Sequence, residues 1–188
     1  KSIYSGKNFT KFDLKRDQRE LFIIDYCLKN KIPLLGICRG HQLIGVSFGF
    51  RIIADLGGSR IVHQPQRESI QYNEDEPIHT VEPVEEHLEE WKSIFGKQKE
   101  RGFINSLMGY ETDSIYVNSF HHQGVGKTKD IQGVTVLGVA DTGMENAKQI
   151  IEVMKGDRWI SCQWHPEYDY HKNTSSSDIL RYFGKMMG

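Results

Sequence analysis

The chain has 188 residues, and its 24 lysines and arginines nearly balance its 25 aspartates and glutamates, which gives a formal net charge of −1. This length predicts one domain over residues 1–188 with a sizeable hydrophobic core. The balance of charge provides no basic field for nucleic acid and no cationic cluster for a membrane surface. No apolar stretch has transmembrane length, and residues 1–4 do not begin a signal peptide.

The three cysteines, Cys27, Cys38 and Cys162, lie at unrelated spacings, and no Cys-x-x-Cys pair occurs. An odd number of such cysteines argues against a disulfide framework and against structural zinc. We therefore expect a protein of the reducing cytoplasm.

The first predicted elements are a helix, a buried strand and a second helix. Asp13 can cap a helix that runs to about Asn30, with Leu14, Leu21, Ile24 and Leu28 on one face. Residues 32–37 are an apolar run that fits a strand buried on both faces, and helical spacing follows up to residue 49. A parallel sheet needs more strands than this beginning supplies, so we expect a first β-α-β portion upstream of residue 1.

Cys38 lies between Gly36 and Gly40, where the apolar strand becomes a helix. This Gly-x-Cys-x-Gly pattern is the cysteine version of a nucleophile elbow, in which glycines keep side chains clear of a strained turn. The helix N-terminus beneath the sulfur favours the reactive thiolate. A buried, inert cysteine is the alternative, but the glycine spacing and the strand-to-helix context favour a nucleophile.

The rest of the chain alternates further strands with two helices. Residues 59–75 are expected to be loop and residues 96–113 a connector. The short spacings between the last three strands predict antiparallel hairpins, so the sheet should have a parallel centre and an antiparallel margin. The expected strands are residues 51–54, 77–81, 114–117, 133–140, 149–154 and 159–163, and the expected helices are residues 84–95 and 175–187.

His165-Pro166-Glu167 follows the last strand and can supply the base that a cysteine nucleophile needs. Pro166 restrains His165 toward an extended conformation, so His165 and Glu167 can present their side chains on one side of the chain. A carboxylate beside an imidazole fixes its tautomer and stabilises the imidazolium. An ordinary loop is the alternative for this tripeptide alone, and its pairing with an elbow cysteine favours catalysis.

The elbow (residues 36–42) together with residues 163–167 resembles the class I glutamine amidotransferases, and the tract at residues 117–123 resembles their γ-glutamyl hydrolase branch, the peptidase C26 group. Arg16-Asp17 is also similar to that branch. The resemblance implies an α/β, three-layer, flavodoxin-like fold that is N-terminally incomplete here. It implies hydrolysis of a γ-glutamyl amide through a thioester on Cys38, with His165 as general base and acid and Glu167 as its orienting group.

The same resemblance implies contacts with the substrate. The backbone N–H of Arg39 would donate to the oxyanion, Gln42 would hold the glutamyl end, and Ser119, Phe120 and His121 would approach it. For His121, packing at a strand end is an alternative to a part in catalysis. No cofactor is expected. No metal is expected either, because the histidines at 63, 79, 121, 122 and 171 show no known ligand spacing.

The leading hypothesis is a free-standing hydrolase of a small γ-glutamyl conjugate, with no nucleic-acid or membrane partner, and a homo-oligomer is compatible with it. The alternative is a glutaminase subunit that passes ammonia to a synthase. A non-catalytic binding module would be expected to lack Cys38, His165 or Glu167, and all three are present. Residues 84–113 form a longer segment than the branch usually has, so they could shape the amine side of the pocket.

Overall fold

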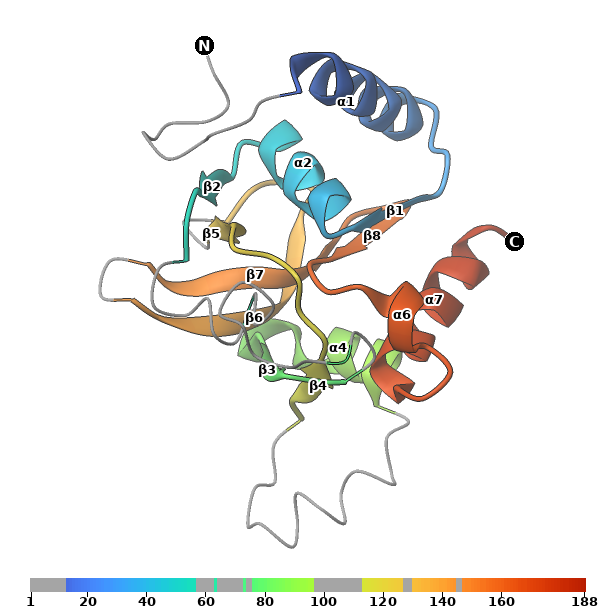
Figure 1. Cartoon of the computed structure of the whole chain (residues 1–188). Helices are drawn as coiled ribbons and strands as arrows, with labels where there is room; N and C mark the ends of the chain where they lie inside the picture. The colour runs from blue at the N-terminus through green and yellow to red at the C-terminus, as the bar shows by residue number, and fades with distance from the viewer. Residues whose placement is uncertain are drawn as a thin grey trace, which may run out of the picture.

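The computed structural model describes residues 13–56, 63, 73, 76–96, 113–126, 130–144 and 147–188 (Figure 1). Most of the predicted loop at 59–75 and connector at 96–113 lies outside these residues. The helices are α1 (Leu14–Lys29), α2 (Arg39–Ser47), the 3-10 turn η3 (Glu85–His87), α4 (Leu88–Phe95), α6 (Pro166–Asp169) and α7 (Thr174–Met186). The strands are β1 (Leu34–Ile37), β2 (Arg51–Ile53), β3 (His79–Pro83), β4 (Ile115–Val117), β5 (Gly124–Gly126), β6 (Thr135–Met144), β7 (Ala147–Lys155) and β8 (Trp159–Cys162).

The first helix begins and ends as its sequence predicts. The Asp13 carboxylate accepts a hydrogen bond from the Arg16 backbone N–H at 2.9 Å, which satisfies one of the free donors of the first turn. Ile24 is buried against the sheet, but Leu14, expected on the same face, is 66% exposed. The apolar contact of α1 therefore starts about two turns into the helix.

The fold class is confirmed as α/β, with an antiparallel margin on the sheet. Among the described strands the order is β1-β8-β7-β6-β3-β4, and β5 joins β2 to β7. Only β1 and β8 pair in parallel in this part of the chain; the other pairs are antiparallel, including the predicted β6-β7 and β7-β8 neighbours. The short connections between β6, β7 and β8 account for their antiparallel pairing, as the sequence predicts.

Helices cover both faces of the sheet, so the protein has three layers (Figure 1). On one face α1 and α2 pack with Ile151 and Met154 of β7. On the other face α4 and α7 pack with Leu137 of β6 and with Trp164. Leu34 and Leu35 contribute to opposite cores, as alternation along a strand requires. No helix in the described ranges is both long and apolar enough to cross a membrane.

Gly138 tests the packing between β6 and α4. A Cβ at this position would lie 2.5 Å from the ring of Trp91 and 2.9 Å from Val81, and both side chains are buried. Gly138→Ala should lower the free energy of unfolding by about 1–3 kcal/mol, because an overpacked core forces its neighbours to move.

The matched control is Gly184→Ala in α7, where no atom lies within 4 Å of an added Cβ. It should stabilise the protein by up to about 1 kcal/mol through helix propensity. Urea unfolding of both variants makes the comparison, and equal stability of the two would contradict the packing argument.

Candidate active site

Cys38 joins β1 to α2 in a strained backbone conformation. Its φ of 49° and ψ of −101° lie in a region that residues with a side chain rarely adopt. Its N–H donates to the Cys162 carbonyl at 2.9 Å, and its own carbonyl accepts the first hydrogen bond of α2, from Gln42 at 3.1 Å. The sulfur is therefore fixed at the carboxyl end of β1, at the N-terminus of a helix.

The two glycines of the elbow differ in how much space they need. A Cβ at Gly36 would lie 2.6 Å from the Ile44 side chain and 3.0 Å from Ser161. A Cβ at Gly40 would meet no atom within 4 Å. The expectation that glycine clears the turn is therefore met at Gly36, and among the described residues nothing crowds Gly40.

A buried histidine holds α2 against the sheet. His41 is fully buried, and its Nε2 donates to the Ile151 carbonyl at 2.9 Å, so its Nδ1 accepts from the Ser161 hydroxyl at 2.9 Å. Burial lowers the pKa of His41 to about 4, although the hydrogen bond donated to the Ile151 carbonyl opposes this. His41 is thus a neutral anchor that fixes the helix under Cys38.

His165 and Glu167 form a hydrogen-bonded pair beyond the end of β8. The Nδ1 of His165 lies 2.7 Å from a carboxylate oxygen of Glu167. His165 is the N-cap of α6, so Glu167 is helical; the expectation of an extended segment through Glu167 was wrong because Pro166 occupies the first helical position, which proline favours. The His165 ring also stacks on Tyr168 and meets Phe120 edge-on.

The pair has the electrostatics of a carboxylate and an imidazolium. Burial lowers the pKa of His165, but hydrogen bonds and charge from Cys38 and Glu167 outweigh burial and raise that pKa to about 9. Burial likewise raises the pKa of Glu167, and the hydrogen bond from His165 reverses this, so the net direction is downward. Because the carboxylate binds Nδ1–H, Nε2 is left as the nitrogen that can exchange a proton.

Two polar residues that the sequence analysis did not single out, Asn118 and Gln163, contact His165 and Cys38. We call the surface formed by Cys38, His165 and these two residues the Cys38 and His165 wall. Asn118 accepts from the His165 N–H at 2.9 Å and donates to the His165 carbonyl at 2.8 Å, so it holds the backbone of His165 in place. The Gln163 amide donates to the Cys38 sulfur at 3.6 Å, and its oxygen accepts from Gln42 at 3.1 Å. Both lie within the tracts that carry the family resemblance, and membership of those tracts was their only signal.

The residues expected to touch substrate differ in whether their side chains lie near His165 or are engaged elsewhere. The Arg39 side chain turns away to Asp17 and Glu20 at 2.5 and 2.7 Å, which leaves only its backbone at the elbow. Phe120 contacts the His165 ring. The hydroxyl of Ser119 and the ring of His121 are both buried: the first donates to the His63 carbonyl at 2.8 Å, and the second packs against the His63 ring.

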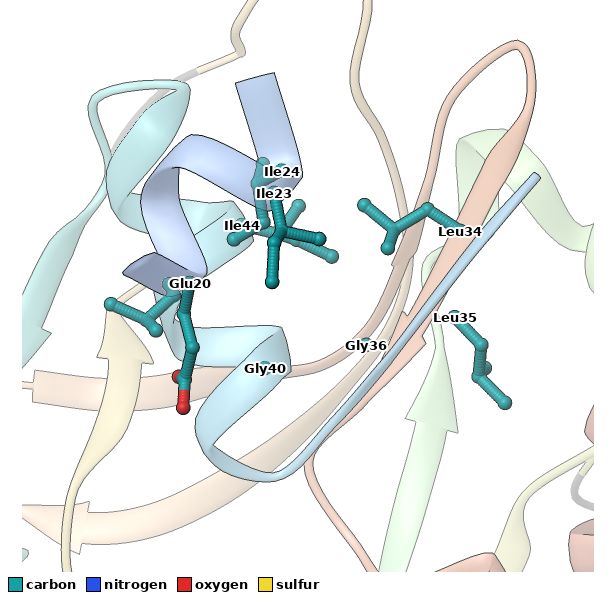
Figure 2. A pocket seen from close by; sticks show the side chains of 9 residues that line it. Glu20, Ile23, Ile24, Leu34, Leu35, Gly36, Gly40 and Ile44 are labelled. Atoms are coloured by element: carbon teal, nitrogen blue, oxygen red, sulfur yellow. The ribbon is translucent and has the colours of Figure 1, made fainter. Parts of the chain in front are cut away.

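A cavity of about 150 Å³ lies behind the elbow, between α1, β1 and α2 (Figure 2). Figure 2 shows the Leu34 side chain of β1 pointing toward the isoleucines 23, 24 and 44, which overlap in this view. Neither Cys38 nor His165 lines it. It is a packing gap under α1, apart from the Cys38 and His165 wall.

Comparisons with known proteins agree on one family. The sequence model of peptidase C26 matches residues 4–167. A protein of Schizosaccharomyces pombe, whose name assigns it to the glutamine amidotransferases, is 31% identical over 173 residues, which is 91% of this chain and 57% of that protein. A γ-glutamyl-γ-aminobutyrate hydrolase of Escherichia coli strain K12 is 27% identical over 160 residues, 84% of this chain and 54% of that enzyme. The chain thus spans a little more than half the length of these curated relatives.

A solved structure supports the fold. A protein of Thermoplasma acidophilum, described as part of a GMP synthase, superposes with a TM-score of 0.55 at 17% identity. The superposition covers 92% of this chain and 66% of that one. At this level of identity the likeness concerns the fold alone.

Glu167→Gln should lower the pKa of His165 below about 9, because the neutral amide no longer stabilises the imidazolium. NMR titration of the His165 ring measures the shift. The exposed residue Glu89 of α4 gives the control substitution Glu89→Gln, which should leave the titration unchanged. An unchanged His165 pKa in Glu167→Gln would show that the carboxylate does not set the charge of this imidazole.

Proposed function

We propose that this chain, which belongs to the peptidase C26 family, hydrolyses the γ-glutamyl amide bond of a small conjugate through a thioester on Cys38. The match to the peptidase C26 model and the names of the relatives support a hydrolase or an amidotransferase of this family. The identity of the nucleophile, of the base and of the substrate is what we propose in addition.

The observation that carries the proposal is the convergence of two chain segments. Cys38 sits at positive φ on the elbow at the end of β1, and His165, whose Nδ1 is held by Glu167, follows the paired strand β8, where the Cys38 sulfur helps to raise its pKa. A nucleophile, a base and an orienting carboxylate in that order are what acyl transfer through cysteine requires.

The proposed reaction has two stages. The Cys38 sulfur attacks the γ-carbonyl carbon of the substrate, and His165 gives its proton to the departing amine as the C–N bond breaks. Water then attacks the thioester, His165 takes a proton from it, and the C–S bond breaks to release glutamate. Glu167 keeps Nδ1 protonated throughout, so that Nε2 alone exchanges the proton.

The backbone N–H of Arg39 is the proposed oxyanion donor. It belongs to the first turn of α2, where N–H groups have no partner within the helix. Gln42 and Phe120 lie beside the nucleophile and the base and are the proposed contacts for the glutamyl end. The side chains of Ser119 and His121 are engaged elsewhere, and the His121 N–H donates to the His63 carbonyl, so the Ser119 main chain and the His121 carbonyl remain the proposed contacts.

A second function shares the same chemistry, because the glutamine side chain is itself a γ-amide. In that case the leaving amine is ammonia and a synthase consumes it. The glutamine amidotransferase name of the Schizosaccharomyces pombe relative is the observation that favours it.

Cys38→Ser should reduce kcat at least about 100-fold without changing the fold, because a hydroxyl is a far poorer nucleophile at a site built for thiolate. Turnover of γ-glutamyl amides measures the loss, and mass spectrometry of quenched enzyme should find the γ-glutamyl group on the Cys38 peptide of the wild type. Cys27→Ser in α1 is the control and should keep full activity. A Cys38→Ser variant with wild-type turnover would remove the thioester mechanism.

The enzyme should turn over γ-glutamyl conjugates of the correct amine with a higher kcat/KM than free glutamine. Binding energy from the non-reacting amine can lower the barrier, and ammonia offers no such contacts. The 84–113 segment, whose described part includes α4, is the proposed source of those contacts, although residues 97–112 lie outside the described ranges. A panel of γ-glutamyl amides compared with glutamine decides between the two functions: if glutamine is the best substrate, the ammonia-donor function is correct.

A further inference from the structure

Four buried side chains from distant parts of the chain converge beside the 118–123 loop. One ligand atom from each of His63, His79, His121 and Glu152 lies within 4.8 Å of the others. His79 begins β3, His121 follows β4, and Glu152 lies within β7. Each residue is at most 9% exposed. We call these four residues the His63 cluster.

Backbone carbonyls fix the orientation of two of the rings. The Nδ1 of His79 donates to the Thr80 carbonyl at 3.0 Å, and the Nδ1 of His121 donates to the Gln123 carbonyl at 2.8 Å. A carbonyl only accepts, so in each neutral ring the proton is on Nδ1 and Nε2 carries a lone pair. Metal-binding histidines are commonly held in this way, with the second nitrogen bonded to a carbonyl.

The atoms that face the interior of the cluster lack hydrogen-bond partners. Among the described residues this holds for Nε2 of His79 and His121 and for both carboxylate oxygens of Glu152. Neither nitrogen of His63 makes a hydrogen bond of standard geometry, although the Asp141 backbone lies near enough to favour its protonation. His121 Nε2 lies 3.5 Å from a Glu152 oxygen. Buried polar atoms without partners are costly and rare, and so many in one place need a common partner.

The burial also resists positive charge on the rings. Desolvation lowers the pKa of His63 to about 3, helped by His79 and offset in part by the Asp141 backbone, and desolvation lowers the pKa of His79 to about 4. The pKa of His121 lies well below its usual value and that of Glu152 well above, again chiefly through burial.

We propose that the His63 cluster binds one divalent transition-metal ion, best matched by Zn²⁺, through three histidines and Glu152. Four nitrogen and oxygen ligands supplied by the protein suit tetrahedral Zn²⁺, for which bond lengths near 2.0–2.1 Å place ligand atoms roughly 3.4 Å apart. The His121 to Glu152 separation already matches this, and small side-chain movements bring in the others. With all four positions filled and no exposed side, the role is structural.

The position of the cluster indicates what the metal would hold together. The His63 carbonyl accepts from the His121 N–H at 2.7 Å and from Ser119. Asn118, on the same loop as His121, holds the backbone of His165. In β7, the Glu152 carbonyl accepts from the Gln163 N–H at 2.9 Å. A metal here would tie β3, β7 and the 118–123 loop together behind the wall that carries His165 and Gln163. The inference does not depend on the proposed reaction.

The test measures zinc in and on the purified full chain. Elemental analysis after expression with zinc should give close to one Zn²⁺ per chain, and a strong chelator should lower the Tm, with Zn²⁺ restoring it. Cobalt substituted for zinc should give the intense visible bands of a four-coordinate site. Absence of bound metal together with a Tm that neither chelator nor Zn²⁺ changes would overturn the proposal and leave a neutral packed cluster.

Glu152→Gln and His79→Gln should each weaken Zn²⁺ binding at least about 100-fold, since loss of an outer partner alone costs 10- to 100-fold. His171→Gln, at an exposed position near α6, is the control and should bind as the wild type does. Equal binding by all three variants would place the zinc elsewhere and contradict the proposal. If a cluster variant does not fold, the cobalt spectrum of the wild type still decides, because six-coordinate surface binding gives only weak bands.

Discussion

The pairing of β1 with β8 sets the geometry on which the candidate active site depends. It is the parallel pair of the described sheet, with Ile37 opposite Cys162, so both strands end at the same edge. The hydrogen bond from the Cys38 N–H to the Cys162 carbonyl extends that register by one step beyond β1. Residues that follow the two strands must therefore meet, and these are Cys38 on one side and His165 on the other.

The elbow can keep its strain because the surrounding contacts leave it no alternative. A non-glycine residue at positive φ costs on the order of 1–3 kcal/mol unless its neighbours hold it in place. Here the strand fixes Cys38 from one side, and His41 fixes α2 from the other by two buried hydrogen bonds to β7 and β8. The tight approach of Ile44 to Gly36 removes the remaining freedom. The strained backbone of Cys38 is thus held in place by the packing of α2 against the sheet.

Sequence patterns predicted the elements that their own residues determine. Apolar runs and caps were sufficient for α1, β1, α2 and the three-strand antiparallel series, because period and turn chemistry are local. The strand β5 was missed, since Gly124–Gly126 has one apolar side chain and is a strand only because β2 and β7 lie on either side of it. The helical turn α6 was missed for a similar reason, as four residues are too few to show a period.

The residues of the candidate site show the same difference between local sequence signals and contacts with distant segments. Cys38 and the His165-Pro166-Glu167 tripeptide stand out because the chemistry needs rare residue types at a strand end. Asn118 and Gln163 act through hydrogen bonds to segments 47 and 125 positions away, and such bonds leave no pattern along the chain. The His63 cluster is the extreme case: its four residues lie at 63, 79, 121 and 152, so no short ligand spacing exists to be recognised.

The 118–123 loop connects the two sites that we propose. At one end Asn118 holds the backbone of His165, and at the other His121 faces Glu152 and His63. A loop this short cannot shift at one end without moving the other, because its backbone has few free torsions and several fixed partners. Order in the His63 cluster would therefore be transmitted to the position of the proposed base, whereas Cys38 is fixed separately through β1 and α2. The proposed nucleophile and the proposed base thus share the β1–β8 pair, and the proposed base has a further support through the buried histidines.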